Sequence, residues 1–177
     1  IVFHFSGVRP LPTADVKFAG FVSRDHSIKT IDPDEAIHFP VYSLVGGKWT
    51  TFRAFSEQVT DKMLEKLGLK RKIDTGNVAI GGGENYPRSA DERAAWVQAL
   101  SQKSGLSIEQ VTTLFERYGT RAQAYAEYIA AEPDEVIRSQ PTYTRREIMF
   151  IAQNEGVIHL DDVILRRSLL GMLGYVD

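Results

Sequence analysis

The stretch Val41–Arg53 reads VYSLVGGKWTTFR and sets the organisation of the chain around it. Its first part, Val41–Val45, is an apolar run of β-formers and predicts a buried strand. From Trp49 to Leu67 apolar residues recur every three or four positions, which predicts an amphipathic helix that Gly68 ends. A strand that passes through glycines into a helix leaves backbone N–H groups free at the positive end of the helix dipole. The junction is therefore a candidate anion site.

The glycines of this junction do not form a phosphate loop of the nucleotide-triphosphate kind. That motif needs a glycine five residues before Gly47 and a Ser or Thr after Lys48, but Tyr42 and Trp49 occupy these positions. Gly46 and Gly47 can equally make nothing more than a tight strand-to-helix turn. A binding role for the junction and this plain structural role both stay open on the residues alone.

The two sides of the junction differ in periodicity. Before it, the short apolar segments 1–5, 18–23 and 27–31 are typical of strands, and the proline-containing stretch 9–15 predicts a loop. After the long helix, residues 69–88 read as a linker that contains Gly81-Gly82-Gly83. The remainder predicts helices, which are expected from Ser89 to about Ser104, from Ser107 to Gly119, from Ala122 to Ala131, from Thr144 to Gly156, and from Leu160 to Leu170.

Composition excludes several classes of protein. The 177 residues carry 21 Lys and Arg against 23 Asp and Glu, a net charge of -2, so nucleic acid is not an expected partner. There is no cysteine, which excludes disulfides, thiol catalysis and cysteine-ligated metals. No apolar run approaches the ~18 residues of a membrane-spanning helix. The four histidines show no metal-ligand spacing, so no metal site is expected.

Two arginines near the start of the chain are candidate ligands for an anion. Arg9 stands on a loop bounded by Gly7 and Pro10, and an arginine fork suits phosphate or carboxylate. Arg24 stands beside Asp25 at the end of a predicted strand. The alternative for Arg9 is a surface arginine with no role, and for Arg24 it is a structural ion pair with Asp25.

Three segments together resemble one family. They are Ser6–Pro10, Ser23–His26 and the string from Gly46 to Arg53, and in this order and spacing they resemble the C-terminal part of FAD-dependent, aerobic-type glycerol-3-phosphate dehydrogenase. The helical half adds segments that resemble the family's C-terminal cap: Arg117–Thr120, Glu147-Ile148, Glu155 and Leu160–Arg167. The resemblance covers nearly the whole chain.

The resemblance implies an α+β fold in three parts. Residues 1–68 would be a β-rich remnant, the C-terminal end of an FAD and substrate domain that closes in a long helix. Residues 69–88 would be a linker, and residues 89–177 an all-α cap domain. The abrupt start at Ile1, in what reads as a strand, fits such a piece of a longer enzyme.

The resemblance also implies a reaction and its residues. A hydride would pass from C2 of sn-glycerol 3-phosphate to FAD, giving dihydroxyacetone phosphate, and a membrane quinone would take the electrons. Arg9, Arg24 and Lys48 match substrate-phosphate and active-site positions. The segment Gly46, Gly47, Lys48, Trp49 and Thr50 matches the part that lies against the flavin. His26 stands where the family often has tyrosine, so its role stays open.

The chain lacks the Gly-x-Gly-x-x-Gly string that would hold the FAD pyrophosphate, so the fragment by itself is expected to be inactive and not to bind FAD tightly. The sequence leaves the electron acceptor open, which is either quinone or oxygen. It also leaves open whether the chain forms a homo-oligomer, and whether the complete protein is cytoplasmic and contacts the inner face of the cell membrane. The competing hypothesis is a helical protein-interaction module without a catalytic role.

Overall fold

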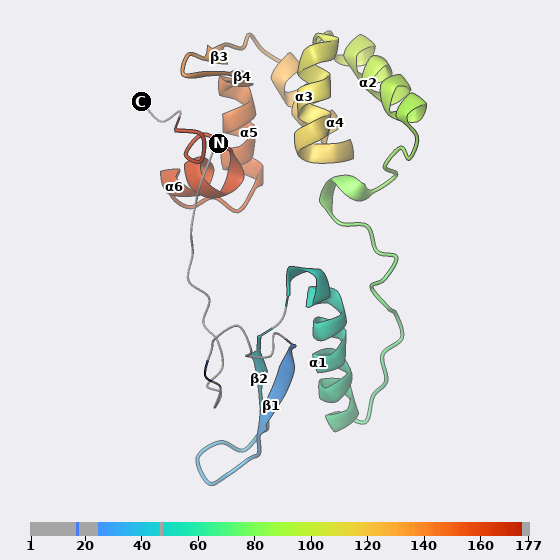
Figure 1. The fold of residues 1–177 in the computed structure, drawn as a ribbon, viewed down its shortest axis with the longest axis vertical. Coiled ribbons are helices and arrows are strands. Elements are labelled where there is room, and N and C mark those ends of the chain that lie inside the picture. The colour runs from blue at the N-terminus through green and yellow to red at the C-terminus, as the bar shows by residue number, and fades with distance from the viewer. Residues whose placement is uncertain (1–16, 18–24, 47, 175–177) are drawn as a thin grey trace. The chain divides into compact units, whose positions relative to one another are not determined.

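A computed structural model describes residues 17, 25–46 and 48–174 (Figure 1). The described chain divides into two compact units, one that ends at Val78 and one that begins at Ala79. Each unit is considered by itself below. The strands predicted at 1–5 and 18–23 lie outside the described residues, and the domain limits 1–68, 69–88 and 89–177 stay a prediction.

The first unit contains an antiparallel hairpin at the positions that the sequence predicts. Strand β1 (Ser27–Ile31) pairs with strand β2 (Val41–Val45), and Ser27 stands opposite Val45. The prediction that Val41–Val45 is buried is wrong for this structure, since its residues are half-buried or exposed and Leu44 is 49% exposed. A hairpin of two strands is too narrow to bury a strand on both faces.

Helix α1 (Phe52–Lys66) follows the short 3-10 turn η2 (Trp49–Thr51), which confirms the predicted helix. Gly68 ends it as predicted, with a φ of 68°. The N–H of Gly68 donates to the carbonyl of Glu65 at 3.0 Å and the N–H of Leu69 to that of Leu64 at 2.8 Å. This pair of bonds is a Schellman motif, which satisfies carbonyl groups that the helix end leaves open.

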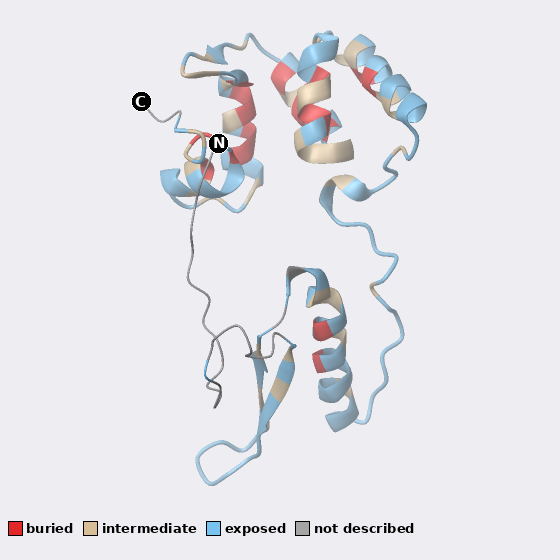
Figure 2. Ribbon diagram, in the orientation of Figure 1, coloured by how far each residue is buried: buried red, intermediate tan, exposed pale blue. Residues whose placement is uncertain are grey.

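Only the middle of the apolar stripe on α1 is buried. Phe55 and Val59 are 8% and 9% exposed, whereas Phe52 and Met63 are each 51% exposed (Figure 2). The stripe therefore has more apolar surface than the described residues of this unit cover.

The chain after α1 is fastened along that helix by a charged cluster. Glu57 accepts hydrogen bonds from the backbone N–H and the hydroxyl of Thr75 at 2.6 and 2.7 Å, and it pairs with Arg71 at 2.9 Å. The bonds from Thr75 hold the pKa of Glu57 below its ordinary value. Arg53 also donates to the Thr75 carbonyl. The first part of the predicted linker is thus attached to α1.

The second unit is mainly helical, as the sequence predicts. Its main helices are α2 (Ala90–Ser104), α3 (Ile108–Tyr118), α4 (Ala122–Ala130) and α5 (Arg145–Asn154). The predicted caps Ser89, Ser107 and Thr144 each accept a bond from the backbone N–H three residues on. Such a bond satisfies one of the N–H groups that a helix start leaves free, which explains why these starts were predictable.

The core of the second unit lies between these helices (Figure 2). Aromatic rings form its centre: Tyr125 stacks on Tyr118 with ring centroids 3.8 Å apart and meets Phe150 at 4.2 Å. The buried residues around them are Val97, Leu100, Val111, Leu114, Phe115, Ala122, Ala126, Ile129 and Ile151.

The predicted all-α cap needs one correction. A second hairpin, β3 (Val136–Ile137) and β4 (Gln140–Thr144), stands between α4 and α5. Pro133 ends the preceding helix region, and Thr142 to Thr144 are residues that favour extended backbone. Tyr143 of β4 is 2% exposed, so tertiary packing holds this short strand in place.

The predicted last helix is also shorter than expected. Helix α6 covers only Leu160–Asp162, and a π-helical turn, η5 (Val163–Arg167), replaces the regular helix up to Leu170. Ser168 is extended, with a φ of -139°, and its hydroxyl donates to the Val163 carbonyl at 2.7 Å. A side-chain bond of this kind competes with the backbone ladder, which explains the early end.

No helix among the described residues is long and apolar enough to cross a membrane. Within the same residues, no three His, Asp or Glu side chains gather as the ligands of a metal ion would.

Candidate functional site

The junction between β2 and α1 is the candidate site, and its backbone turns sharply at Gly46. This glycine has a φ of 76°, and a Cβ added to it would lie 3.1 Å from the Asp25 carbonyl oxygen. Glycine is therefore strongly favoured here, because a side chain would be strained by the positive φ and would crowd the Asp25 carbonyl. This finding supports the structural reading of the glycine, whatever else the junction does.

Lys48 marks the point where the chain enters the helical turn. Its backbone is extended, its N–H donates to the Thr51 hydroxyl at 3.2 Å, and its carbonyl accepts from the Thr51 N–H at 3.0 Å. These bonds order the backbone of the turn and leave the lysine side chain exposed. Gly46 and Thr50 are exposed as well.

Of the residues predicted for the site, the structure describes Gly46, Lys48 and Thr50, which lie within five positions of one another at the junction between β2 and α1. Arg9, Arg24 and Gly47 lie outside the described residues, as does the side chain of Trp49. Their assignment to substrate or flavin stays a prediction.

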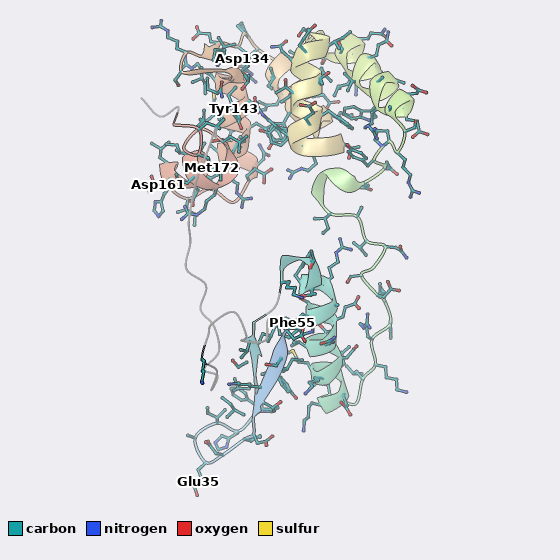
Figure 3. All side chains as sticks on the ribbon, viewed as in Figure 1. Glu35, Phe55, Asp134, Tyr143, Asp161 and Met172 are labelled. Carbon is teal, nitrogen blue, oxygen red and sulfur yellow. The ribbon has the colours of Figure 1, made fainter. Side chains whose placement is uncertain are left out.

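His26 packs against α1. Its ring lies 4.4 Å from the Phe55 ring, and its Nε2 is 3.0 Å from the Gln58 side-chain oxygen. Phe55, labelled in Figure 3, is one of the two buried residues of α1. These contacts show a role for His26 in joining the start of β1 to the helix.

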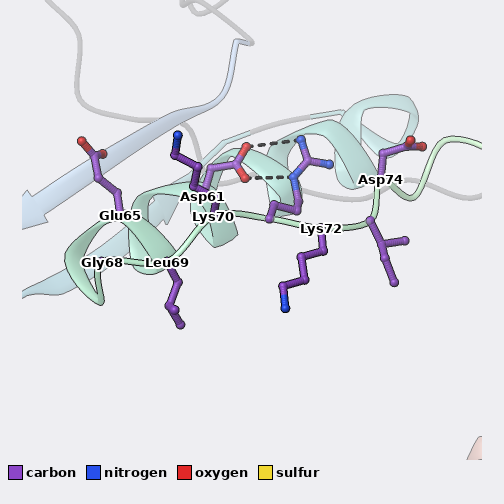
Figure 4. A pocket seen from close by; sticks show the side chains of 9 residues that line it. Asp61, Glu65, Gly68, Leu69, Lys70, Lys72 and Asp74 are labelled. Carbon is purple, nitrogen blue, oxygen red and sulfur yellow. Dashed lines mark hydrogen bonds and ion pairs between the residues drawn. The ribbon is translucent and has the colours of Figure 1, made fainter.

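A broad surface pocket of about 760 Å³ lies at the other end of α1 (Figure 4). Asp61, Glu65 and Asp74 line it together with Lys70, Arg71 and Lys72, so its charges balance. The Arg71 guanidinium is already paired with a carboxylate of the pocket, since it donates to Asp61 at 2.8 Å. No residue predicted for the site lines this pocket, and its chemistry gives no preference for an anion.

The second unit contains a buried network of charged side chains that the sequence analysis did not predict. Arg117 lies 2.9 Å from Glu147, whose side chain is 2% exposed, and the Tyr118 hydroxyl donates to the same carboxylate at 2.6 Å. Burial raises the pKa of Glu147, while the bonds from Tyr118 and Arg117 act to lower it. The sequence showed the two motifs that contain these residues, Arg117–Thr120 and Glu147-Ile148. It did not show that the two motifs are in contact.

A second network gathers around Glu155. Its carboxylate lies 3.0 Å from Arg121 and 4.0 Å from Arg167, and the Tyr125 hydroxyl donates to it at 3.2 Å. Burial, followed by the charge of Glu155, raises the pKa of Tyr125. The phenol therefore stays protonated and acts as a donor to Glu155.

The junction offers the chemistry of an anion contact. Lys48, which is exposed, directly precedes the helical segment that begins with η2 and continues as α1. Helix dipole and lysine charge have the same sign there, so both would stabilise a negative group placed against the turn.

The second unit is a small helical domain with a β-hairpin insert and buried arginine–carboxylate networks. Residues 73–175 match the family model described as the C-terminal domain of alpha-glycerophosphate oxidase. This match covers more than half of the chain, and the chain belongs to that family.

Curated relatives match over almost the whole chain. A glycerol-3-phosphate dehydrogenase of Synechocystis is 31% identical over an alignment that covers 97% of this chain and 30% of that protein. A probable glycerol-3-phosphate dehydrogenase of Encephalitozoon cuniculi is 26% identical, over 96% of this chain and 26% of that protein. The mitochondrial enzyme of Saccharomyces cerevisiae is 24% identical, over 89% and 24% respectively.

These matches confirm the resemblance to the C-terminal part of glycerol-3-phosphate dehydrogenases. The chain spans only about a quarter to a third of the length of these relatives.

Proposed function

We propose that the chain forms the C-terminal part of a flavoenzyme that oxidises sn-glycerol 3-phosphate to dihydroxyacetone phosphate. The observation that carries this proposal is the match of 97% of the chain to a glycerol-3-phosphate dehydrogenase. On this proposal, the first unit is the end of the FAD and substrate domain, and the second is its helical cap.

FAD, when bound, supplies the acceptor for the hydride that leaves C2 of the substrate. The described junction supports a place for one edge of this cofactor in the proposal, because an exposed lysine and a helix start would stabilise the negative charge of a reduced flavin. Lys48 would hold that charge, and Gly46, Gly47, Trp49 and Thr50 would lie against the ring. Arg9 would bind the substrate phosphate, and Arg24 would be a second arginine of the active site.

Lys48 provides the direct test in the complete enzyme. We expect Lys48→Ala to lower kcat for glycerol 3-phosphate oxidation by ~10²-fold, the usual effect of removing one electrostatic contact to the reacting groups. Lys62→Ala is the matched control, since Lys62 is an exposed lysine of α1 away from the junction. Steady-state kinetics with a dye acceptor measure both variants. Equal activity of Lys48→Ala and the unaltered enzyme would favour the interaction-module hypothesis instead.

Isolation of the chain tests the flavin assignment separately. We expect the 177-residue chain to release added FAD during gel filtration, because its sequence has no glycine-rich motif for the pyrophosphate. Absorbance of the protein peak at the flavin maximum measures the bound fraction. A yellow complex of one FAD per chain would show that the cofactor site is contained in these residues.

The electron acceptor has two candidates, because the family model carries the name of an oxidase and the relatives that of dehydrogenases. We propose quinone, reached by peripheral contact of the complete enzyme with the membrane. Turnover with a quinone analogue and no hydrogen peroxide supports this acceptor, whereas oxygen consumption with hydrogen peroxide formation supports the oxidase.

A further inference from the structure

Four arginines of the second unit meet at one small cavity of about 270 Å³. They come from separate parts of the chain: the end of α3, the start of α4, and the π-helical turn η5. The residues that line this cavity, the arginine pocket below, are Gly81, Gly82, Arg117, Tyr118, Arg121, Tyr125, Glu155, Arg166 and Arg167.

The charges of the arginine pocket do not cancel. Arg117 is neutralised by the buried Glu147 at 2.9 Å, and Arg166 pairs with Asp162 at 2.8 Å. The two remaining arginines share the single carboxylate of Glu155. One guanidinium charge is therefore left without a carboxylate of its own.

The two arginines that share Glu155 also have donors to spare. Arg121 and Arg167 are each 43% exposed, and neither makes a hydrogen bond to another described residue beyond its ion pair. The Arg167–Glu155 distance of 4.0 Å is too long for a hydrogen bond. Because a guanidinium presents five N–H groups in a planar fork, both arginines can bind a second oxyanion while Glu155 keeps its place.

The backbone around the pocket holds this arrangement. The π-helical turn places Arg166 and Arg167 on the pocket wall, and turns of this kind are frequent at functional sites. Glu155 is fixed from the inner side by the Tyr125 hydroxyl at 3.2 Å. The Thr120 hydroxyl lies within hydrogen-bond distance of the Glu84 carbonyl at 2.7 Å and of the Gly82 carbonyl at 3.0 Å, so it keeps the glycine turn in contact with the unit.

We propose that the arginine pocket binds a small phosphate-bearing anion between Arg121 and Arg167. A dianionic oxyanion suits two forks and one uncompensated charge better than a monoanionic carboxylate does. The volume admits a phosphate or phosphomonoester head and is below the usual size of pockets for larger ligands. The proposal uses none of the junction residues, so it stands or falls independently of the proposed function.

Isothermal titration calorimetry of the 177-residue chain with inorganic phosphate, at low ionic strength, tests the proposal. We expect one saturable site with a dissociation constant of about 1 mM. Arg121→Gln and Arg167→Gln should each weaken binding by about tenfold, since each removes a charge-assisted fork. Arg145→Gln should leave binding unchanged, because Arg145 is an exposed arginine that pairs with Glu135 outside the pocket.

Glu155→Gln gives a result that misfolding cannot imitate. Removing the carboxylate that competes for both forks should tighten phosphate binding by about threefold to tenfold. Parallel titrations with glycerol 3-phosphate distinguish a phosphomonoester ligand from the free ion, and binding of either supports the site. Absence of saturable binding of both phosphate and glycerol 3-phosphate, equal binding by Arg121→Gln, or equal affinity for acetate would overturn the proposal.

Discussion

Replacing Arg117 with alanine is expected to lower the free energy of unfolding by about 3 to 5 kcal/mol, because it leaves the buried Glu147 carboxylate without its cation. Arg117, on α3, contacts two other elements at once. Besides Glu147 on α5, it donates to the Thr142 carbonyl of β4 at 2.8 Å, and its guanidinium carbon lies 3.5 Å from the centroid of the Tyr143 ring, which also belongs to β4. Urea denaturation followed by circular dichroism measures the effect.

Lys103→Ala is the matched control for Arg117→Ala. Lys103 makes an ion pair with Glu127 at 2.8 Å, close to the Arg117–Glu147 distance of 2.9 Å, but both of its side chains are about half exposed. Water already solvates such a pair, so its loss should cost no more than about 1 kcal/mol. The double variant Arg117→Ala with Glu147→Gln should recover part of the loss, because no bare charge remains buried. Equal costs for Arg117→Ala and Lys103→Ala would contradict the prediction.

Gly82→Ala is expected to destabilise the second unit by about 3 kcal/mol, through a collision that no side-chain movement relieves. The 3-10 turn η3 (Gly81–Gly83) lies against the end of α3, where a Cβ on Gly82 would overlap the Tyr118 carbonyl oxygen and lie 2.9 Å from the Gly119 Cα. Both obstacles are backbone atoms, so the turn or the helix end has to move. Thermal unfolding of the variant measures the cost.

The neighbouring glycine provides the control for this prediction. A Cβ on Gly83 would meet nothing within 4 Å, and the φ of Gly83 is not positive. Gly83→Ala should therefore be neutral or should stabilise slightly, by reducing the entropy of the unfolded chain. If Gly82→Ala proved as mild as Gly83→Ala, the turn would not be docked on α3 in solution.

The glycine run also shows where sequence reasoning was limited. Three consecutive glycines with no strand or helix around them read as a linker. The close approach of Gly82 to Tyr118 joins positions far apart in the chain, and no local pattern encodes it. The same holds for the arginine pocket, since the chain separates Arg121 from Arg167 by several elements.

The sequence by itself determined helices α1 to α5 and the points near which they begin and end. Ser89, Ser107 and Thr144 were recognisable as caps, and Gly68 as a helix end, because the hydrogen bonds that fix a helix end join residues only a few positions apart. The family could also be recognised from the sequence, because the motifs that indicate it are short and local.

Only the tertiary structure decided the burial and the pairing. It left the Val41–Val45 strand half-exposed, inserted the hairpin before α5, and ended the last helix in a π turn. It also joined Arg117 to Glu147, which is 30 residues further along the chain, and it placed two arginines around Glu155. Contacts of this range depend on how the elements pack, and packing is a property of the whole unit that periodicity and capping do not record.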